Sequence, residues 1–146
     1  MRGPRVPISS FGTSDRRESR QRQESEKLLV KAGRALHAAE LLLRDGEPDF
    51  AAGRAYYAMF YAAEAALADM EQQFRKHSGV HAAFGEHLAK PGLLDPKYHR
   101  WLLDAFDKRI LGDYGYEMDV DGAAAGEIIK QAHEFVAAVE TFLRSR

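Results

Sequence analysis

The sequence predicts an all-α protein, most simply an up-and-down bundle of about five helices. Three observations lead to this prediction. Apolar residues recur three and four positions apart through most of the chain, no segment shows the alternation typical of a strand, and one stretch is apolar on nearly every side. That stretch covers residues 53–67 and reads GRAYYAMFYAAEAAL. A helix of this kind belongs in the centre of a bundle.

The central stretch carries large rings on one side and alanines on the other when it is wound at about 100° per residue. The ring side is formed by Tyr56, Tyr57, Phe60 and Tyr61. Glu64 interrupts that side, and the tyrosines bring three hydroxyl groups with them. Because buried polar groups need hydrogen-bond partners, we expect a polar network beside this helix.

The totals describe one ordinary globular domain of 146 residues. The chain has no cysteine, which excludes disulfides, thiolate metal sites and a cysteine nucleophile, and fits a reducing compartment. No apolar run approaches the roughly 18 residues of a membrane span, and the N-terminus lacks the apolar core of a secretory signal. The sequence therefore predicts a cytoplasmic protein.

Charge is distributed unevenly along the chain. Residues 1–22 contain six arginines against Asp15 and Glu18, a net charge of +4, and subtracting this from the total of -1 leaves -5 for the rest. We expect residues 1–23, rich in Arg, Ser, Pro and Gly, to be a disordered basic tail, and residues 24–146 to form the domain. The tail is either a nucleic-acid arm or a solvated leader.

The first two helices are separated by a short turn. Residues 24–44 place leucine and alanine three and four apart, as an amphipathic helix does. Asp45-Gly46-Glu47-Pro48 then supplies turn chemistry, and the central helix is expected over about residues 49–72. Since the connection is short, these two helices should pack antiparallel.

A shorter third helix is expected after a polar break at residues 73–77. Ser78 is the expected N-cap of this helix, which should end near Leu88 because Lys90-Pro91-Gly92 follows.

The last two helices have clear starts. Asp95 is the expected N-cap of the fourth helix, with Pro96 in its first position. Residues 111–121 have three glycines in or next to them and are expected to be irregular. The final helix is expected over about residues 123–144, where Ile, Phe, Val and Leu follow helical spacing.

Arg109 is the first candidate for a functional side chain. It shares a helix stripe with Leu102 and Ala105, so its guanidinium should point toward the bundle, and it lies near a helix C-terminus, where a cation is favoured. Its planar fork of donors suits phosphate and carboxylate equally. Two interpretations stay open: Arg109 pairs with Asp113 or Glu64 as a structural ion pair, or it holds a phosphate and stabilises the charge of a phosphoryl transition state.

His77 and His81 are the second candidates, because residues four apart face the same side of a helix. Two histidines at this spacing can bind a metal only with a third ligand, which no recognised pattern supplies, so we predict no metal and no cofactor. They are ordinary polar or interface residues, or one of them acts as a general acid–base near neutral pH. Tyr57 either packs in the core or stacks a base.

Several short stretches together resemble a known family. They are RAYYAMFYAA at residues 54–63, HSGV at residues 77–80, and Arg109 followed by Asp113-Tyr114 ahead of the last helix. Over about residues 25–143 the chain resembles a HEPN domain, and more narrowly a small stand-alone branch of uncharacterised prokaryotic HEPN proteins.

The resemblance implies a helical bundle that pairs as a homodimer. It also implies a setting in which many relatives are metal-independent endoribonucleases or toxins, acting beside a minimal nucleotidyltransferase that serves as antitoxin. The family's catalytic signature is an arginine followed a few residues later by a histidine, just ahead of the final helix. Arg109 matches the arginine, but Gly115 follows Tyr114 where the histidine would stand, and the next histidine is His133.

The sequence therefore predicts a binding component of a toxin–antitoxin-like HEPN system, with a degenerate catalytic motif and a nucleotide, RNA or nucleotidyltransferase as partner. One alternative is an active endoribonuclease in which Arg109 acts with a displaced histidine, for which we choose His81. Another is a structural adaptor without catalysis. The expected ligand-binding residues are Arg109, Asp113, Tyr114, His77, Tyr57 and Glu64.

Overall fold

The computed structural model describes residues 8–70, 76–114 and 120–146, and of residues 8–15 and 110–114 it describes the backbone alone. These ranges contain five α-helices, one π-helical segment and no strand. The prediction of an all-α fold is confirmed.

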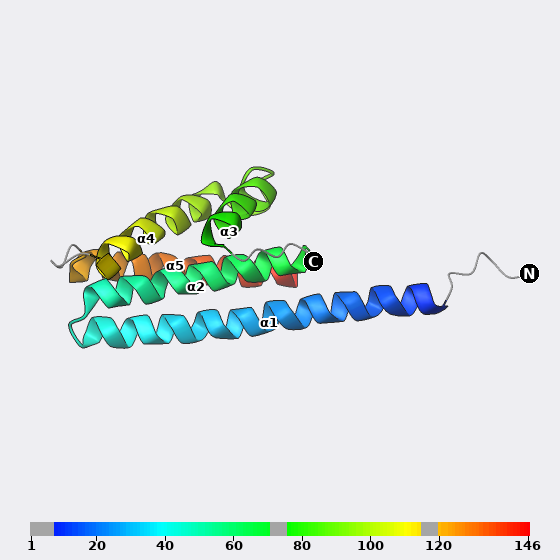
Figure 1. Ribbon diagram of the computed structural model, residues 1–146, viewed down its shortest axis with the longest axis horizontal. Helices are drawn as coiled ribbons and strands as arrows, with labels where there is room; N and C mark the ends of the chain where they lie inside the picture. The colour runs from blue at the N-terminus through cyan, green and yellow to red at the C-terminus, as the bar shows by residue number, and fades with distance from the viewer. Residues whose placement is uncertain (1–7, 71–75, 115–119) are drawn as a thin grey trace, which may run out of the picture.

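The α-helices are α1 (Ile8–Arg44), α2 (Pro48–Asp69), α3 (His77–Phe84), α4 (Pro96–Tyr114) and α5 (Gly122–Arg144), with the π-helical segment η1 (Gly85–Ala89) directly after α3. Figure 1 shows α1 along one side of α2 and α3 and α4 on the opposite side, with α5 overlapping α2 in the view, and α2 contacts each of these four helices. The expected central helix is thus the centre of the bundle.

The two sides of α2 are buried by different means. Ala55, Ala58 and Ala62 are fully buried, and small side chains of this kind let a neighbouring helix approach closely. Ser25 of α1 donates a hydrogen bond of 2.8 Å to the carbonyl of Ala65, which ties α1 to the alanine side. The ring side packs against α3 and α4, and burying each large side chain there stabilises the fold by roughly 1.5–3 kcal/mol.

Helix α1 begins at Ile8, earlier than the expected start at residue 24. Its first part projects beyond the other helices (Figure 1), and residues 16–20 are exposed. Arginine, glutamine and glutamate are good helix formers, so local propensity extends the helix where no core is present. The division between a tail of residues 1–23 and a domain of residues 24–146 stays a prediction.

The expected turn and the expected cap at Asp95 are present, but the cap prediction at Ser78 was wrong. A short connection with Gly46 at φ 81° joins α1 to α2. Asp95 accepts a hydrogen bond of 2.9 Å from the amide of Lys97 at the start of α4. Ser78 does not cap α3: the helix begins at His77, and Ser78 lies inside its first turn.

The region ahead of α5 also differs from the prediction. Helix α4 continues to Tyr114, so residues 111–114 are helical and were wrongly expected to be irregular. The preceding turns of α4 carry the helix through Gly112, because adding a residue to an existing helix is easier than starting one. The rest of that stretch up to residue 119, and residues 73–75 of the expected polar break, lie outside the described residues.

The π-helical segment was not foreseen by the helical periodicity. At Gly85 an added Cβ would lie 2.7 Å from the His99 ring, so the absence of a side chain there admits the imidazole of α4. The Nε2–H of His99 donates a hydrogen bond of 3.0 Å to the carbonyl of His81 in α3. The π-helical turn thus lies where α4 and α3 approach each other.

Candidate functional site

Arg109 lies against α2, on the ring of Tyr57. Its side chain is half-buried, as its helix stripe predicts, and its guanidinium carbon is 5.1 Å from the centre of the Tyr57 ring. The guanidinium carbon of Arg54 is 4.8 Å from the centre of the same ring. A cation over an aromatic ring is attracted by the ring's electron-rich face, so one tyrosine holds two arginines from two helices.

These residues line a pocket of about 230 Å³. Leu42 of α1 and Phe50 of α2 give it apolar walls, and Arg54, Tyr57 and Arg109 give it polar ones. No acidic side chain is among the described residues that line it. We call this the two-arginine pocket. Its chemistry favours a small anion, since guanidinium groups bind the oxygens of phosphate or carboxylate in pairs.

A hydrogen-bond network lies on the next face of the same helix. The hydroxyl of Tyr56 is 2.7 Å from Nδ1 of His77 and 2.7 Å from Nε2 of His81. The Tyr56 side chain is fully buried, and burial, with the nearby Tyr57, raises the pKa of its hydroxyl far above the usual value, so the group stays neutral. The polar network expected beside the central helix is present at Tyr56.

The two histidines are not equivalent. His81 is buried, with 6% of its surface exposed. Burial is the largest cause that lowers its pKa to about 4, and His77 and His99 lower it further. His77 is half-buried and stacks on Phe60 with ring centres 4.3 Å apart. Burial, and after it the charge of Arg109, lowers the pKa of His77. Both imidazoles are therefore biased toward the neutral form.

Tyr57 connects the network to the two-arginine pocket. Its ring centre is 5.8 Å from that of His77, in an edge-on arrangement, while Arg109 contacts the same ring. The charge of Arg109 acts on both His77 and Tyr56, because it lowers the pKa of each. The structure thus brings together three residues that the sequence singled out: Arg109, Tyr57 and His77.

The other predicted site residues lie apart from these or are not described. Glu64 lies about two turns of α2 beyond Tyr57. Its pKa is raised by burial, lowered by Lys31 of α1 and raised by Glu24 of α1, which places Glu64 toward α1. Asp113 and Tyr114 end α4, and their side chains are outside the described part.

Two residues of this region were missed as site residues. Arg54 appeared only inside the resembling stretch, and Tyr56 only as part of the ring side. The available signal was spacing: Arg54 stands three residues before Tyr57, so both belong to one helix face. The bonds of Tyr56 to His77 and His81 join residues 21 and 25 positions apart, which no local pattern reveals.

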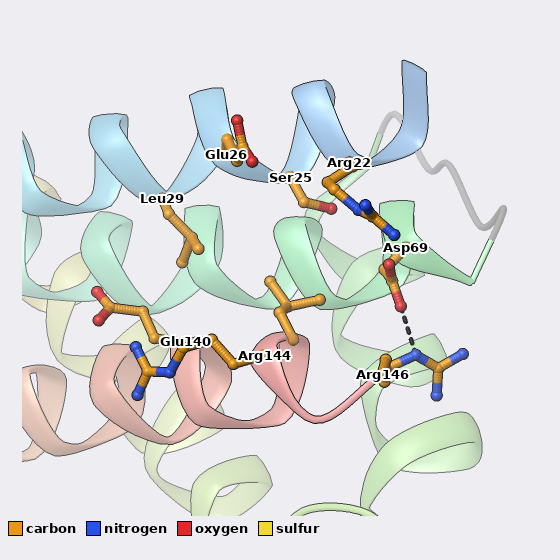
Figure 2. Close-up of a pocket in the computed structure, with 9 residues that line it drawn as sticks. Arg22, Ser25, Glu26, Leu29, Asp69, Glu140, Arg144 and Arg146 are labelled. Atoms are coloured by element: carbon orange, nitrogen blue, oxygen red, sulfur yellow. Dashed lines mark hydrogen bonds and ion pairs between the residues drawn. The ribbon is translucent and has the colours of Figure 1, made fainter. Parts of the chain in front are cut away.

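A larger pocket of about 540 Å³ lies at the other end of α2. Figure 2 shows Arg22 and Glu26 of α1 on one side of it, Arg144 of α5 on the other, and the ion pair between Arg146 and Asp69. Both acidic and basic side chains line it, so we call it the mixed-charge pocket. No residue lining it was selected from the sequence.

Two general searches of the described part of the chain gave negative results. No group of three or more histidine, aspartate or glutamate side chains is placed there to hold a metal ion. No helix in that part is long and apolar enough to cross a membrane.

The chain was also compared with known proteins. A family model described as HEPN domain matches residues 25–142. UPF0332 protein glr0978 of Gloeobacter violaceus is 44% identical over 92 residues, which are 63% of this chain and 73% of that protein. Two relatives come from Methanocaldococcus jannaschii. "Putative toxin MJ0142" is 33% identical over 129 residues, 88% of either chain, and "Putative toxin MJ0605" is 30% identical over 123 residues, 84% of this chain and 91% of that protein. Both the resemblance and the helical bundle agree with this match, and the chain belongs to the HEPN domain family.

Proposed function

We propose that this protein is the RNA- or nucleotide-binding HEPN component of a toxin–antitoxin-like system, and that it binds phosphate in the two-arginine pocket. The observation that carries the proposal is the pair of guanidiniums, Arg54 and Arg109, on the single ring of Tyr57. A pocket with two cations and no acidic residue among its described lining residues concentrates positive charge in one place.

The pocket also offers contacts for the rest of a nucleotide. Phe50 lines it and has 53% of its surface exposed. An exposed aromatic ring beside a phosphate site provides a platform on which a base can stack, and such stacking contributes about 1–3 kcal/mol per base. Single-stranded RNA, which presents phosphate and unpaired bases together, fits this combination better than an isolated anion.

The setting and the partner come from the relatives and the family. Two relatives carry the word toxin in their names, and HEPN domains often act with a minimal nucleotidyltransferase. The proposed protein partner is therefore such a nucleotidyltransferase acting as antitoxin, and a copurification of the two coexpressed chains tests it. Failure of the pair to copurify would remove the partner and leave RNA binding to be tested by itself.

A homodimer is part of the proposal. Val30 and Leu41 on the outside of α1 have 66% and 39% of their surfaces exposed, and residues eleven apart lie on nearly the same side of a helix. In a homodimer formed along this side of α1, both side chains would be removed from water. Light scattering of the purified chain should give the mass of two chains, and a monomer at micromolar concentration would contradict this.

The test of phosphate binding is fluorescence anisotropy with a labelled single-stranded RNA. Arg109→Ala should weaken binding about tenfold, since a charged hydrogen bond contributes about 1.5–3 kcal/mol, and should flatten the dependence of affinity on salt. The matched control is Arg100→Ala, an exposed arginine of the same helix that does not line the pocket. Equal affinities for both variants would contradict the proposal and favour the structural adaptor.

A metal-independent endoribonuclease is the second candidate function. The observation that favours it is the imidazole of His77, which contacts the Tyr57 ring that Arg109 also contacts. RNA cleavage through the 2′-hydroxyl needs a cation on the phosphate and a group that moves a proton near neutral pH. Arg109 supplies the first and a histidine supplies the second.

A further inference from the structure

The bonds around Tyr56 restrict the hydrogens of two histidines at once. A tyrosine hydroxyl has a single hydrogen to donate, yet here it is within hydrogen-bond distance of two ring nitrogens, one from His77 and one from His81. When both histidines are neutral and the buried hydroxyl donates to one of these nitrogens, that nitrogen accepts and the other donates to the hydroxyl oxygen. Two arrangements then satisfy both bonds and the hydroxyl hydrogen; if both nitrogens donated to the oxygen's two lone pairs, neither histidine would accept the buried hydroxyl hydrogen.

In the first arrangement, Nδ1–H of His77 donates to the Tyr56 oxygen, and the Tyr56 hydroxyl donates to Nε2 of His81. In the second, both bonds run in the opposite direction. The hydrogens are therefore coupled: both histidines carry them on Nδ1 or both carry them on Nε2. Since a neutral imidazole has one donor and one acceptor nitrogen, the network decides whether Nε2 of His77 accepts or donates.

Only the first arrangement is compatible with a charged His77. A protonated imidazole has hydrogens on both nitrogens, so its Nδ1–H must donate to the Tyr56 oxygen, and the hydroxyl must then donate to His81. A His77 held this way can take a proton at Nε2 and return it with no change in the remaining bonds. His81 can serve as the acceptor at neutral pH because its pKa, lowered by burial to about 4, keeps its Nε2 free of a second hydrogen.

Exposure assigns the roles within the pair. His81 is buried and bonded through Nε2, so an external molecule does not reach that nitrogen. His77 is half-buried, and its ring is held by stacking on Phe60 while its Nε2 lies outside the network. The choice of His81 as the displaced catalytic histidine is therefore not favoured by the geometry.

We infer that His77 is the general acid–base of this HEPN site, and that Tyr56 and His81 are positioning residues that hold its hydrogen on Nδ1. The inference rests on the proposed function, because it needs an RNA phosphate held at Arg109. In the step itself, the 2′-hydroxyl gives its proton to Nε2 of His77 and its oxygen attacks the adjacent phosphorus. The bond from phosphorus to the 5′-oxygen breaks, and that oxygen takes the proton from Nε2.

Several charged and titratable groups surround His77 and His81 and influence the pKa values of these two histidines. Arg109 of α4 acts on His77. Asp107 and His99, also of α4, act on His81, with Asp107 raising its pKa and His99 lowering it. Tyr57 of α2 contacts His77 edge-on. Cleavage should rise with pH as His77 loses its proton, and the pH at half-maximal rate should lie below the usual histidine pKa of about 6.5.

The activity test uses the full chain and a single-stranded RNA in the presence of a chelator. His77→Asn should lower the cleavage rate by about 10²–10⁴-fold, the usual contribution of general acid–base catalysis, while RNA affinity changes less than twofold. His81→Gln, whose amide oxygen can still accept from Tyr56, should retain more activity than His81→Leu. The control is His37→Asn, an exposed histidine of α1, which should cleave RNA at the unchanged rate.

Nitrogen NMR of the unmodified protein tests the positioning part without any variant. Long-range ¹⁵N–¹H spectra should show the hydrogens of His77 and His81 both on Nδ1 or both on Nε2. In Tyr56→Phe, which lacks the hydroxyl, the tautomers of the two histidines should no longer be coupled. Opposite tautomers in the unmodified protein would overturn the coupling.

The failures are distinguishable. Unmodified protein that binds RNA through Arg109 but leaves it intact, or His77→Asn that cleaves at the full rate, overturns the role of His77 and leaves the proposed binding function standing. If Arg109→Ala instead binds RNA as tightly as the unmodified protein, the proposed function is overturned.

Discussion

The two ends of α2 carry two pockets of opposite character. The mixed-charge pocket, beside Asp69, is the larger at about 540 Å³, and its arginines stand among acidic residues. The two-arginine pocket, beside Gly53, has about 230 Å³ and concentrates its cations on one ring. By the rise of a helix the two lie roughly 24 Å apart. The comparison teaches that two like charges gathered on one ring, and not volume, mark the better candidate for an anion site.

The largest expected effect separates the two pockets directly. Replacing Arg54 and Arg109 together by alanine should weaken RNA binding about 100-fold, because two charged contacts are lost from a site with no others of that sign among its described lining residues. Replacing Arg144 and Arg146 together should change affinity less than threefold. Equal losses for the two pairs, measured by anisotropy, would show that RNA binds to overall charge and not to a pocket.

The next largest effect is the pH dependence of the free energy of unfolding that arises from His81. The folded pKa of His81 is about 4, below the usual 6.5, so the unfolded chain binds more protons between these values. The contribution of His81 to the free energy of unfolding should therefore be complete above pH 6.5. The free energy of unfolding should fall by about 2 kcal/mol between pH 7 and pH 5. Urea unfolding at both pH values measures the loss.

The matched control for this prediction is His81→Gln, which does not titrate. The variant should lose much less stability over the same interval, and an equal loss in both proteins would assign the effect to other groups.

A smaller effect is expected at Ser25, near the mixed-charge pocket. Its hydroxyl donates to the carbonyl of Ala65 inside the α1–α2 contact. Ser25→Ala should lower the free energy of unfolding by about 1 kcal/mol, the usual net contribution of such a bond. RNA affinity should stay unchanged. A loss of affinity would mean that the two ends of α2 are coupled.

The smallest effect is expected from the ion pair of the mixed-charge pocket. Asp69 and Arg146 are both partly exposed, and exposed ion pairs contribute about 0–1 kcal/mol. Asp69→Asn should shift the midpoint of urea unfolding only slightly. A loss above about 2 kcal/mol would show that this pair closes the end of the bundle more firmly than its exposure indicates.

The helical periodicity of the chain determined the fold class, the central position of α2 and the approximate ranges of the helices after α1. These features depend on which residues recur every three or four positions, and that information is local. The cap at Asp95 and the turn before Pro48 were predictable for the same reason. The position of Arg109 on its helix stripe was enough to expect that its side chain faces the bundle.

The geometry of the proposed site depends on the tertiary structure. The sharing of Tyr57 by Arg54 and Arg109, and the choice between a buried His81 and an accessible His77, depend on how α3 and α4 lie across α2. The late end of α4 and the π-helical turn at Gly85 were also beyond the local pattern. The physical reason is that these contacts join residues far apart in the chain, where packing between helices, and not propensity within one helix, sets the geometry.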